Sequence, residues 1–294
     1  MLYFSSLLKT DPQYSASAQN LLAALNANKI KYDLLSDTKD IWVRDFMPVR
    51  RWDKHISFRY EPSYLKDQPQ LRTDFRRDIS GRFSIFDDSD PDDVIYSDIN
   101  LDGGNVVLSP SKGKTVISDR VFSENPGYDW AALVRELEEL LSAQVIIIPS
   151  LSSDMTGHAD GMVRFVDENT VVGNATSYQN GLEQRIKKVL ALHGINTIDF
   201  PYFSSARGSA AGCYLNFLEA DSFHEADRRL LLPVFGHSMD EQAVRAAEQI
   251  FAVPIIPIRI DEIAKSGGGL NCVSWEIRLK DTVKKGHNER RVII

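Results

Sequence analysis

Residues 105–117 read Asn-Val-Val-Leu-Ser-Pro-Ser-Lys-Gly-Lys-Thr-Val-Ile, two short apolar segments separated by a polar turn. Short β-branched runs bounded by Pro, Ser and Gly are typical of two paired strands. The chain continues into residues 130–141, where leucines recur at helical spacing, and then into the apolar run 145–148. This stretch predicts a unit of two strands, a helix and a third strand, which we call a ββαβ unit.

The same layout recurs along the chain. A second copy is predicted from strands 162–166 and 170–172, helix 179–193 and strand 197–200, and a third from strands 214–218 and 229–232, helix 240–251 and strand 254–258. Strand 2–7, helix 16–25 and strand 32–35 predict a fourth, partial copy, and we expect strand 273–279 to complete a closed ring. A ββαβ unit cannot bury its own sheet face, so repeated units must pack around a common axis. The irregular segment 66–93 is expected to form loops or a lid.

Composition limits the classes of protein that fit. The chain has 294 residues, 43% of them hydrophobic, enough to bury a sizeable core, and we interpret residues 1–294 as a single catalytic domain. Its two cysteines fit a reducing compartment. Since no apolar run approaches the length that spans a bilayer and no signal peptide is apparent, we expect a cytoplasmic protein without membrane contact. The net charge of -7 disfavours nucleic acid and is compatible with a cationic small molecule. Whether the chain forms a homo-oligomer is left open.

Cys272 is the leading nucleophile candidate because it ends the run Gly267-Gly268-Gly269-Leu270-Asn271-Cys272. Successive glycines remove side chains from the approach to the sulfur and allow unusual backbone conformations. The thiolate is the attacking species, so a bound cation or a nearby imidazolium would increase its reactivity. Cys213 begins an apolar segment and is interpreted as a core residue.

A histidine and two carboxylates are candidates for the rest of the chemistry. His158 and Asp160 lie in Gly157-His158-Ala159-Asp160, directly before a predicted strand, and Asp45 lies in Trp42-Val43-Arg44-Asp45, which we expect to follow a short apolar strand. An imidazole can give a proton to a leaving amine and take one from water. Two carboxylates can bind a planar guanidinium through paired hydrogen bonds. Trp42 could offer a cation–π face, and Asp102 and Asn216 are further candidates.

No metal or organic cofactor is predicted. The chain lacks the paired Cys or His spacing of structural zinc sites and an HExxH helix, although His158 and Asp160 are possible ligand types. No GxGxxG or Walker-type loop follows a predicted strand, which disfavours nucleotide cofactors.

Together these motifs resemble the agmatine deiminase and bacterial peptidylarginine deiminase group of the guanidine-modifying superfamily. The resemblance covers most of the chain from residue 42 onward and rests on the motifs around Trp42, Asp102, His158, Asn216 and Cys272, with Leu232-Pro233-Val234-Phe235-Gly236. It implies a pseudo-fivefold α/β propeller, the pentein fold, built from ββαβ modules. The chain departs from the pattern at Asn271, where relatives carry histidine, and at Asp102, where glutamate is frequent.

The resemblance also implies a reaction. Cys272 would attack a guanidinium carbon, His158 would transfer protons, and Asp45 and Asp160 would hold the guanidinium nitrogens, without any cofactor. Trp42, Arg44, Asp102, Asn216 and Gly269 are the corresponding candidates for substrate binding. The expected reaction is hydrolysis of agmatine to N-carbamoylputrescine and ammonia, or of an arginine derivative to citrulline, through a Cys272 thiouronium intermediate. Transfer of the amidino group to an amine and non-catalytic guanidine binding remain alternatives.

Overall fold

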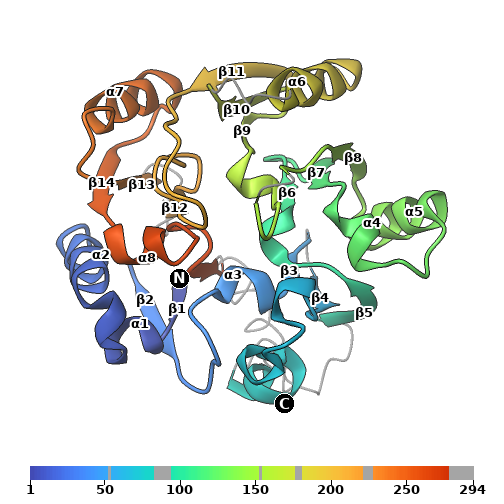
Figure 1. The fold of residues 1–294 in the computed structure, drawn as a ribbon, viewed down its shortest axis with the longest axis horizontal. Helices are drawn as coiled ribbons and strands as arrows, with labels where there is room; N and C mark the ends of the chain where they lie inside the picture. The colour runs from blue at the N-terminus through green and yellow to red at the C-terminus, as the bar shows by residue number, and fades with distance from the viewer. Residues whose placement is uncertain (52–53, 83–93, 152–153, 176–180, 221–227, 278–294) are drawn as a thin grey trace, which may run out of the picture.

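A computed structural model describes residues 1–51, 54–82, 94–151, 154–175, 181–220 and 228–277. Within these residues the chain forms five three-stranded sheets. The sheets surround the middle of the molecule, and the longer helices lie on its outside (Figure 1). Each sheet holds one antiparallel and one parallel strand pair, so the repeated layout seen in the sequence is the repeated layout of the fold.

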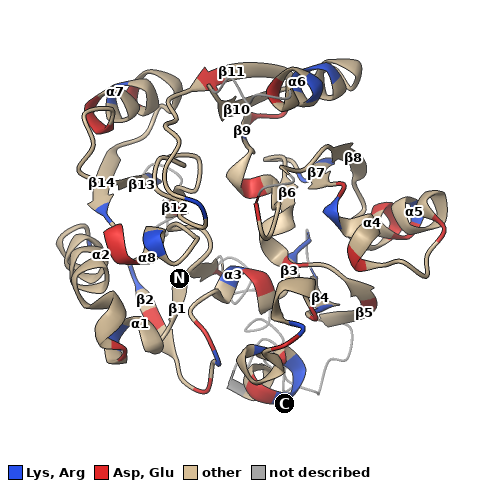
Figure 2. Ribbon diagram, viewed as in Figure 1, with Lys and Arg blue, Asp and Glu red and all other residues tan. Residues whose placement is uncertain are grey.

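The unit predicted from residues 105–148 is confirmed. Strand β6 (Val106–Leu108) pairs antiparallel with β7 (Lys114–Ser118), and β7 pairs parallel with β8 (Gln144–Ile148). The crossover contains helices α4 (Arg120–Glu124) and α5 (Trp130–Leu141). Asp129 caps α5 by accepting a hydrogen bond from the Ala132 N–H at 2.9 Å. Leu133, Leu137 and Leu141 of α5 are buried, while Arg135 and Glu139 are exposed. Figure 2 marks charged residues along α5, α6 (Leu182–Leu192) and α7 (Asp240–Ile250), which lie on the outside of the molecule.

The second and third predicted units also form, although one strand predicted for the third unit is wrong. The second consists of β9 (Val163–Asp167), β10 (Thr170–Asn174), α6 and β11 (Asn196–Phe200), and positions 179–180 of the predicted helix lie outside the described residues. The third consists of β12 (Leu218–Ala220), β13 (Arg229–Val234), α7 and β14 (Ile255–Arg259). The predicted strand 214–218 is wrong, because the chain forms an irregular turn before β12 begins. Tyr214, Leu215 and Phe217 are apolar because they enter a core cluster, not because they line one face of a sheet.

The fourth unit joins the two ends of the described chain. It contains β1 (Leu2–Ser5), α1 (Leu7–Thr10), α2 (Ser15–Ala27) and β2 (Tyr32–Leu35), with β1 and β2 parallel. Strand β15 (Ser274–Glu276) supplies the missing antiparallel partner of β1. A strand therefore forms within the range predicted after Cys272 and pairs with the N-terminal strand, while completion of a closed ring stays a prediction. Positions 278–279 lie outside the described residues.

The fifth unit, which the resemblance implied, was not located from the sequence pattern. It consists of β3 (Val49–Arg50), β4 (His55–Arg59) and β5 (Val94–Asn100), with β4 and β5 parallel. Its crossover lacks a long helix within the described residues and forms short helical turns at Ser63–Leu65, Pro69–Leu71, Phe75–Ile79 and Ser80–Arg82. The described part of the segment, residues 66–82, thus belongs to the crossover of a fifth unit, and the action of the segment as a lid stays a prediction.

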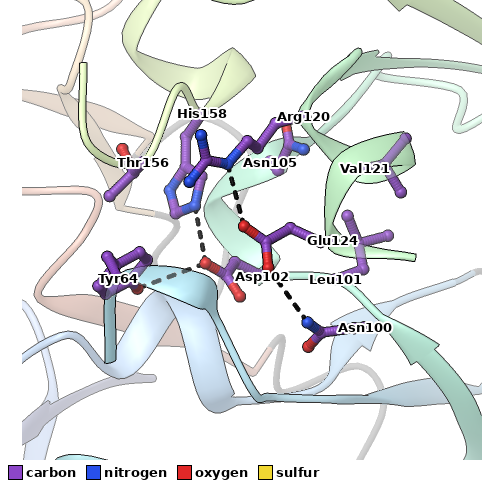
Figure 3. A pocket seen from close by; sticks show the side chains of 10 residues that line it. All are labelled: Tyr64, Asn100, Leu101, Asp102, Asn105, Arg120, Val121, Glu124, Thr156 and His158. Carbon is purple, nitrogen blue, oxygen red and sulfur yellow. Dashed lines mark hydrogen bonds and ion pairs between the residues drawn. The ribbon is translucent and has the colours of Figure 1, made fainter. Parts of the chain in front are cut away.

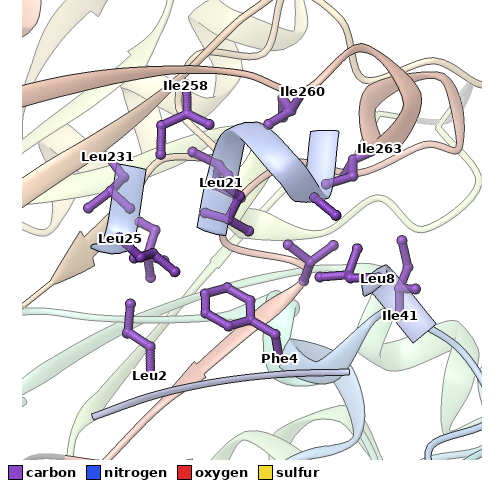
Figure 4. Packing of buried hydrophobic residues seen from close by; sticks show 14 of the residues in the cluster. Leu2, Phe4, Leu8, Leu21, Leu25, Ile41, Leu231, Ile258, Ile260 and Ile263 are labelled. Carbon is purple, nitrogen blue, oxygen red and sulfur yellow. The ribbon is translucent and has the colours of Figure 1, made fainter. Parts of the chain in front are cut away.

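Hydrophobic clusters join neighbouring units. One cluster combines α2 residues Leu21 and Leu25 with Leu231 of β13 and Ile258 of β14, so two adjacent units share one core (Figure 4). Packing between units in this way buries faces that a single unit would leave exposed. None of the helices in the described part of the chain has the length and apolar character needed to cross a membrane.

Candidate active site

Asp45 lies in a single helical turn, α3 (Val43–Phe46), and the strand predicted before it does not form. Val43 and Phe46, three residues apart, share one face of this turn and are buried in a core cluster. Asp45 is also buried, and its Oδ1 accepts a hydrogen bond of 3.1 Å from the backbone N–H of Gly104. The turn therefore holds the carboxylate toward the interior of the molecule.

His158 is placed between two carboxylates. Asp102 directly precedes the 3-10 turn Gly103–Asn105, and His158 directly precedes the 3-10 turn Ala159–Gly161. The imidazole Nε2 lies 2.9 Å from Asp102 Oδ2, and Nδ1 lies 3.6 Å from Asp45 Oδ1. All three side chains are buried, so the imidazole is oriented by contacts that solvent screens little.

Gly104 marks the point where the site residues meet. A Cβ at this position would lie 2.6 Å from Asp45 Oδ1, 2.8 Å from His158 Nδ1 and 3.5 Å from Asp160 Oδ2. Only a residue without a side chain leaves room for these three groups. The glycine-rich turn at residues 102–105 thus allows an imidazole and carboxylates from distant parts of the chain to converge.

Two asparagines connect Asp160 with the nucleophile candidate. The side-chain amides of Asn271 and Asn216 donate to Asp160 Oδ2 at 2.7 and 3.2 Å. Asn216 Oδ1 in turn accepts from the backbone N–H of Cys272 at 3.2 Å. Asn216 does not lie on a strand, as the sequence interpretation had it, but in the turn before β12, where its amide can reach both partners.

The glycine run before Cys272 adopts an unusual backbone conformation, as predicted, and it also makes room for neighbouring side chains. It follows α8 (Asp261–Lys265), and Gly267 has a φ of +103°, a conformation that side chains disfavour. A Cβ on Gly268 would collide with the ring of Trp42, and a Cβ on Gly269 would lie 2.6 Å from Asn216 Oδ1. The glycines make room for neighbouring side chains, and Cys272 itself is partly exposed.

Arg44 supports the backbone around the nucleophile. Its guanidinium forms an ion pair of 2.7 Å with Glu276 and donates to the Asn271 carbonyl at 3.3 Å. Its backbone N–H donates to the Cys272 carbonyl at 3.1 Å. These contacts commit Arg44 to the protein, so its assignment to substrate binding, like that of Trp42 and Gly269, remains a prediction.

The buried charges favour a cationic ligand. Burial raises the pKa of the Asp45 carboxyl, and Asp102 and Asp160 raise it further against the opposing effect of His158. Burial alone would lower the pKa of His158, but the carboxylates of Asp45, Asp102 and Asp160 outweigh it and raise the pKa. Burial raises the pKa of the Cys272 thiol well above its usual value, with further contributions from Asp160 and Asp45. Three carboxyl groups thus act on one imidazole, and Asp160 also acts on the buried guanidinium groups of Arg44 and Arg164, so positive charge is favoured among these side chains.

A small pocket opens on the Asp102 side of His158. Figure 3 shows its polar wall, where Tyr64 reaches Asp102 and Arg120 contacts Glu124. Sequence reasoning missed Tyr64, because nothing in its local pattern distinguishes it from an ordinary loop tyrosine. Asn271 was noted only as a departure from a motif, and its hydrogen bond to Asp160 became visible only in the folded chain.

Metal binding has no support among the described residues. Across residues 1–51, 54–82, 94–151, 154–175, 181–220 and 228–277, no group of three or more His, Cys, Asp or Glu side chains is arranged to hold a metal ion. The absence of a cofactor requirement stays a prediction.

Residues 6–277 match the family described as Porphyromonas-type peptidyl-arginine deiminase. The chain belongs to this family. As a member, it is a guanidine-modifying hydrolase, which agrees with a buried, acidic site beside a cysteine. Comparison with curated proteins gives no match.

Solved structures of low sequence identity share the fold. An agmatine deiminase of C. jejuni, a cysteine-to-serine variant with substrate bound, is 18% identical with a TM-score of 0.71, covering 93% of this chain and 92% of the other. An agmatine deiminase of Enterococcus faecalis is 15% identical with a TM-score of 0.67, covering 93% and 92%. DDAH of Pseudomonas aeruginosa, in complex with citrulline, is 12% identical with a TM-score of 0.57, covering 93% and 97%. The expected pentein-type α/β fold is confirmed by these similarities.

Proposed function

We propose that this family member deiminates a guanidino substrate through covalent catalysis by Cys272, with agmatine as the leading substrate. The observation that carries the proposal is the convergence of Asp45, His158 and Asp160 on Gly104, beside the turn that holds Cys272. A thiol, an imidazole and two carboxylates are the groups that this reaction needs. The products from agmatine would be N-carbamoylputrescine and ammonia.

The carboxylates bind the substrate cation. Asp45 and Asp160 are both buried and face the same small space around Gly104, where a planar guanidinium can donate hydrogen bonds to each. Because these charges are fixed before the ligand arrives, they also stabilise the positive charge that persists during attack. Asp102 contacts His158 and serves to orient the imidazole.

Substrate binding activates the thiol in this proposal. The pKa of Cys272 is raised by burial and then by the carboxylates of Asp160 and Asp45, so the unoccupied site favours the neutral thiol. A bound guanidinium offsets those negative charges and lowers the thiol pKa. Thiolate formation is thereby coupled to the presence of a cation, and the released proton passes to solvent.

The covalent steps then balance as follows. The Cys272 thiolate adds to the guanidinium carbon, and the His158 imidazolium protonates the departing nitrogen, so ammonia leaves and a cationic thiouronium remains on Cys272. Neutral His158 removes a proton from water as the water oxygen adds to the same carbon. The carbon–sulfur bond breaks, the thiolate is restored, and the oxygen-bound proton goes to solvent, leaving a neutral ureido product.

The structural neighbours support this chemistry without identifying the substrate. Two of them are agmatine deiminases, and one of these binds its substrate after a cysteine was replaced by serine. The third holds citrulline, a ureido compound, in a cysteine-to-serine variant. Binding of a guanidine and of a ureide by proteins of this fold fits a deimination reaction in the present chain.

A substrate panel tests the proposal. The purified full chain is mixed separately with agmatine, free arginine and an arginine peptide, and ammonia and the ureido product are measured together. Equimolar release of both from agmatine supports the proposal, and release from an arginine compound alone changes the substrate within the same reaction. A new guanidine formed when primary amines are added would show amidino transfer instead. No product from any compound would overturn the proposal.

A further inference from the structure

Two tyrosine hydroxyl groups extend the polar contacts of His158 into the fifth unit. The Tyr64 hydroxyl lies 3.3 Å from Asp102 Oδ2, the same oxygen that lies 2.9 Å from His158 Nε2. The Tyr60 hydroxyl lies 3.2 Å from that of Tyr64. Tyr64, Asp102 and His158 border one pocket, in which these contacts can be followed directly (Figure 3).

The direction of the hydrogen bonds follows from the number of protons. An ionised carboxylate only accepts, so Tyr64 must donate its single hydroxyl proton to Asp102. Tyr64 can then only accept from Tyr60. Burial raises the pKa of both tyrosines well above their usual value, and the charge of Asp102 adds to the rise, so both hydroxyls stay protonated donors. The result is an ordered chain from Tyr60 through Tyr64 and Asp102 to His158.

The short helical turn that carries Tyr64 is held in place from the neighbouring unit. Ser63 donates its hydroxyl proton to Glu124 Oε1 at 2.6 Å, and its backbone N–H donates to Glu124 Oε2 at 3.0 Å. Arg120 donates to the Ser63 hydroxyl at 2.8 Å and to Glu124 at 3.0 Å. Because α4 fixes the residue before Tyr64, the backbone at Tyr64 is already restricted. The hydrogen bond to Asp102 therefore costs little further conformational entropy.

We propose that Tyr64 is a positioning residue that shares Oδ2 of Asp102 with His158 and so limits how strongly this carboxylate holds the imidazole proton. A donor on a carboxylate stabilises its charge and weakens its pull on a second donor. Proton transfer by an imidazole is most effective when its pKa lies near the working pH. A histidine whose pKa is raised far above the working pH by neighbouring carboxylates is a poor acid. The hydrogen bond from Tyr64 to Asp102 offsets part of that rise.

Other charged groups also act on this histidine and set the background for the effect of Tyr64. Asp45 reaches it from α3, and Asp160 from the turn Ala159–Gly161. The pocket wall on the Asp102 side adds one cation and one carboxylate, which contact each other: Arg120 and Glu124. Since all these groups remain in a Tyr64→Phe variant, that substitution isolates one hydroxyl.

The test measures protonation of His158 directly. In the full-length chain with labelled histidine, NMR follows the imidazole resonances against pH in the wild type and in Tyr64→Phe, with assignment through His158→Gln. We expect the His158 pKa to rise on the order of half a unit in Tyr64→Phe, and by less in Tyr60→Phe, because the lost donor is one step further away. Tyr128→Phe, a change at a partly buried tyrosine packed on a separate cluster, is the matched control.

Turnover gives a second measurement, which depends on the proposed deimination. The shift corresponds to roughly a threefold fall in kcat with KM unchanged, since half a pKa unit is about a factor of three. A merely structural tyrosine would lower Tm and leave the His158 titration where it was. An unchanged or lowered His158 pKa in a folded Tyr64→Phe variant overturns the inference. If the wild type releases no ammonia but the His158 titration still shifts, the proposed function fails while the inference about Tyr64 holds.

Discussion

The centre of the molecule buries ionisable side chains, whereas its outer helices bury apolar ones. At the centre, Asp45, Asp102 and Asp160 are buried, and among the described residues their carboxylates form ion pairs with no lysine or arginine. On the outside, α5 buries Leu133 and Leu137 completely and leaves Arg135 and Glu139 exposed to solvent. The first arrangement disfavours folding and the second stabilises it.

The difference indicates that the outer packing stabilises the fold, while the central side chains are suited to chemistry at a cost in stability. Buried like charges raise the free energy of the folded state, and a protein retains them only where surrounding packing outweighs the cost. The clusters shared between neighbouring units supply that packing. Substitutions at the centre should therefore change turnover more than stability, and substitutions on the outer helices should do the reverse.

Replacing the nucleophile should give the largest effect. Cys272→Ala removes the thiol that forms the proposed intermediate, and we expect turnover to fall by at least about 10⁴-fold with Tm unchanged or slightly raised. Ammonia release and thermal unfolding are measured on the same sample. Cys213→Ser is the control, because a hydroxyl can replace the thiol that contacts the Gly161 carbonyl. Loss of turnover in Cys213→Ser with Cys272→Ala active would reverse the assignment.

Neutralising a site carboxylate should separate turnover from stability. Asp45→Asn keeps an oxygen that can accept from the Gly104 N–H. It removes an ionisable carboxyl group whose pKa is raised by burial and by Asp102 and Asp160. We expect turnover to fall by about 10²-fold or more while the free energy of unfolding near neutral pH rises by about 1 kcal/mol. Denaturant unfolding gives the second quantity. A variant less stable than the wild type would contradict the view that the site is strained by its charges.

An outer-helix cavity should produce the opposite pattern. Leu137→Ala in α5 removes a fully buried side chain, and we expect the free energy of unfolding to fall by about 2–5 kcal/mol. At a temperature where the variant stays folded, KM and kcat should match those of the wild type. The exposed Leu192 of α6 offers a control, because Leu192→Ala opens no cavity. A large change in kcat for folded Leu137→Ala would break the contrast.

Stability should decline as the pH rises from mildly acidic to alkaline. Burial raises the pKa of Asp40 to about 7, and the pKa values of Asp45 and His158 are also raised. A group with a raised pKa binds its proton more tightly in the folded state, so its contribution is present below the unfolded pKa and is lost as the pH rises through the folded pKa. For Asp40 this window runs from about 4 to about 7.

The Asp40→Asn variant measures the share of one group. We expect the difference in unfolding free energy between about pH 5 and about pH 8 to shrink by about 2–3 kcal/mol, because about two of these pH units lie below the folded pKa. Denaturant unfolding at both values provides the comparison, with Asp129→Asn at the exposed cap of α5 as a control for the change in net charge. A wild type that gains stability over this range would contradict the sign of all three shifts.

Much of the fold was predictable because the repeated signals are local. The hairpin at residues 105–117 and the leucine spacing of α5 determine their own elements and bounds. The strands of the fifth unit were not predicted from the local sequence, because the described part of its crossover has short helical turns where the other units have a long helix. Tyr214 and Phe217 led to a wrong strand prediction, because a buried turn can be as apolar in sequence as a buried strand.

The site was predictable as a set of motifs but not as a network. Asp45, His158, Asp160 and Asn216 were identified from short sequence runs, and the structure brings them together. That Asn216 links Asp160 to the Cys272 backbone depends on contacts between residues far apart in the chain. The same holds for Tyr64, whose partner Asp102 follows the last strand of the same unit, 38 positions further along the chain.

The pairing of β15 with β1 has a consequence for how the enzyme is made. Tyr3 lies opposite Trp275, so the sheet beside Cys272, the proposed nucleophile, contains some of the first and some of the last described residues. While the chain is being synthesised, β1 leaves the ribosome long before its antiparallel partner exists. An unfinished polypeptide therefore has an unpaired edge and no held cysteine, and reactivity begins only when synthesis of this segment is complete.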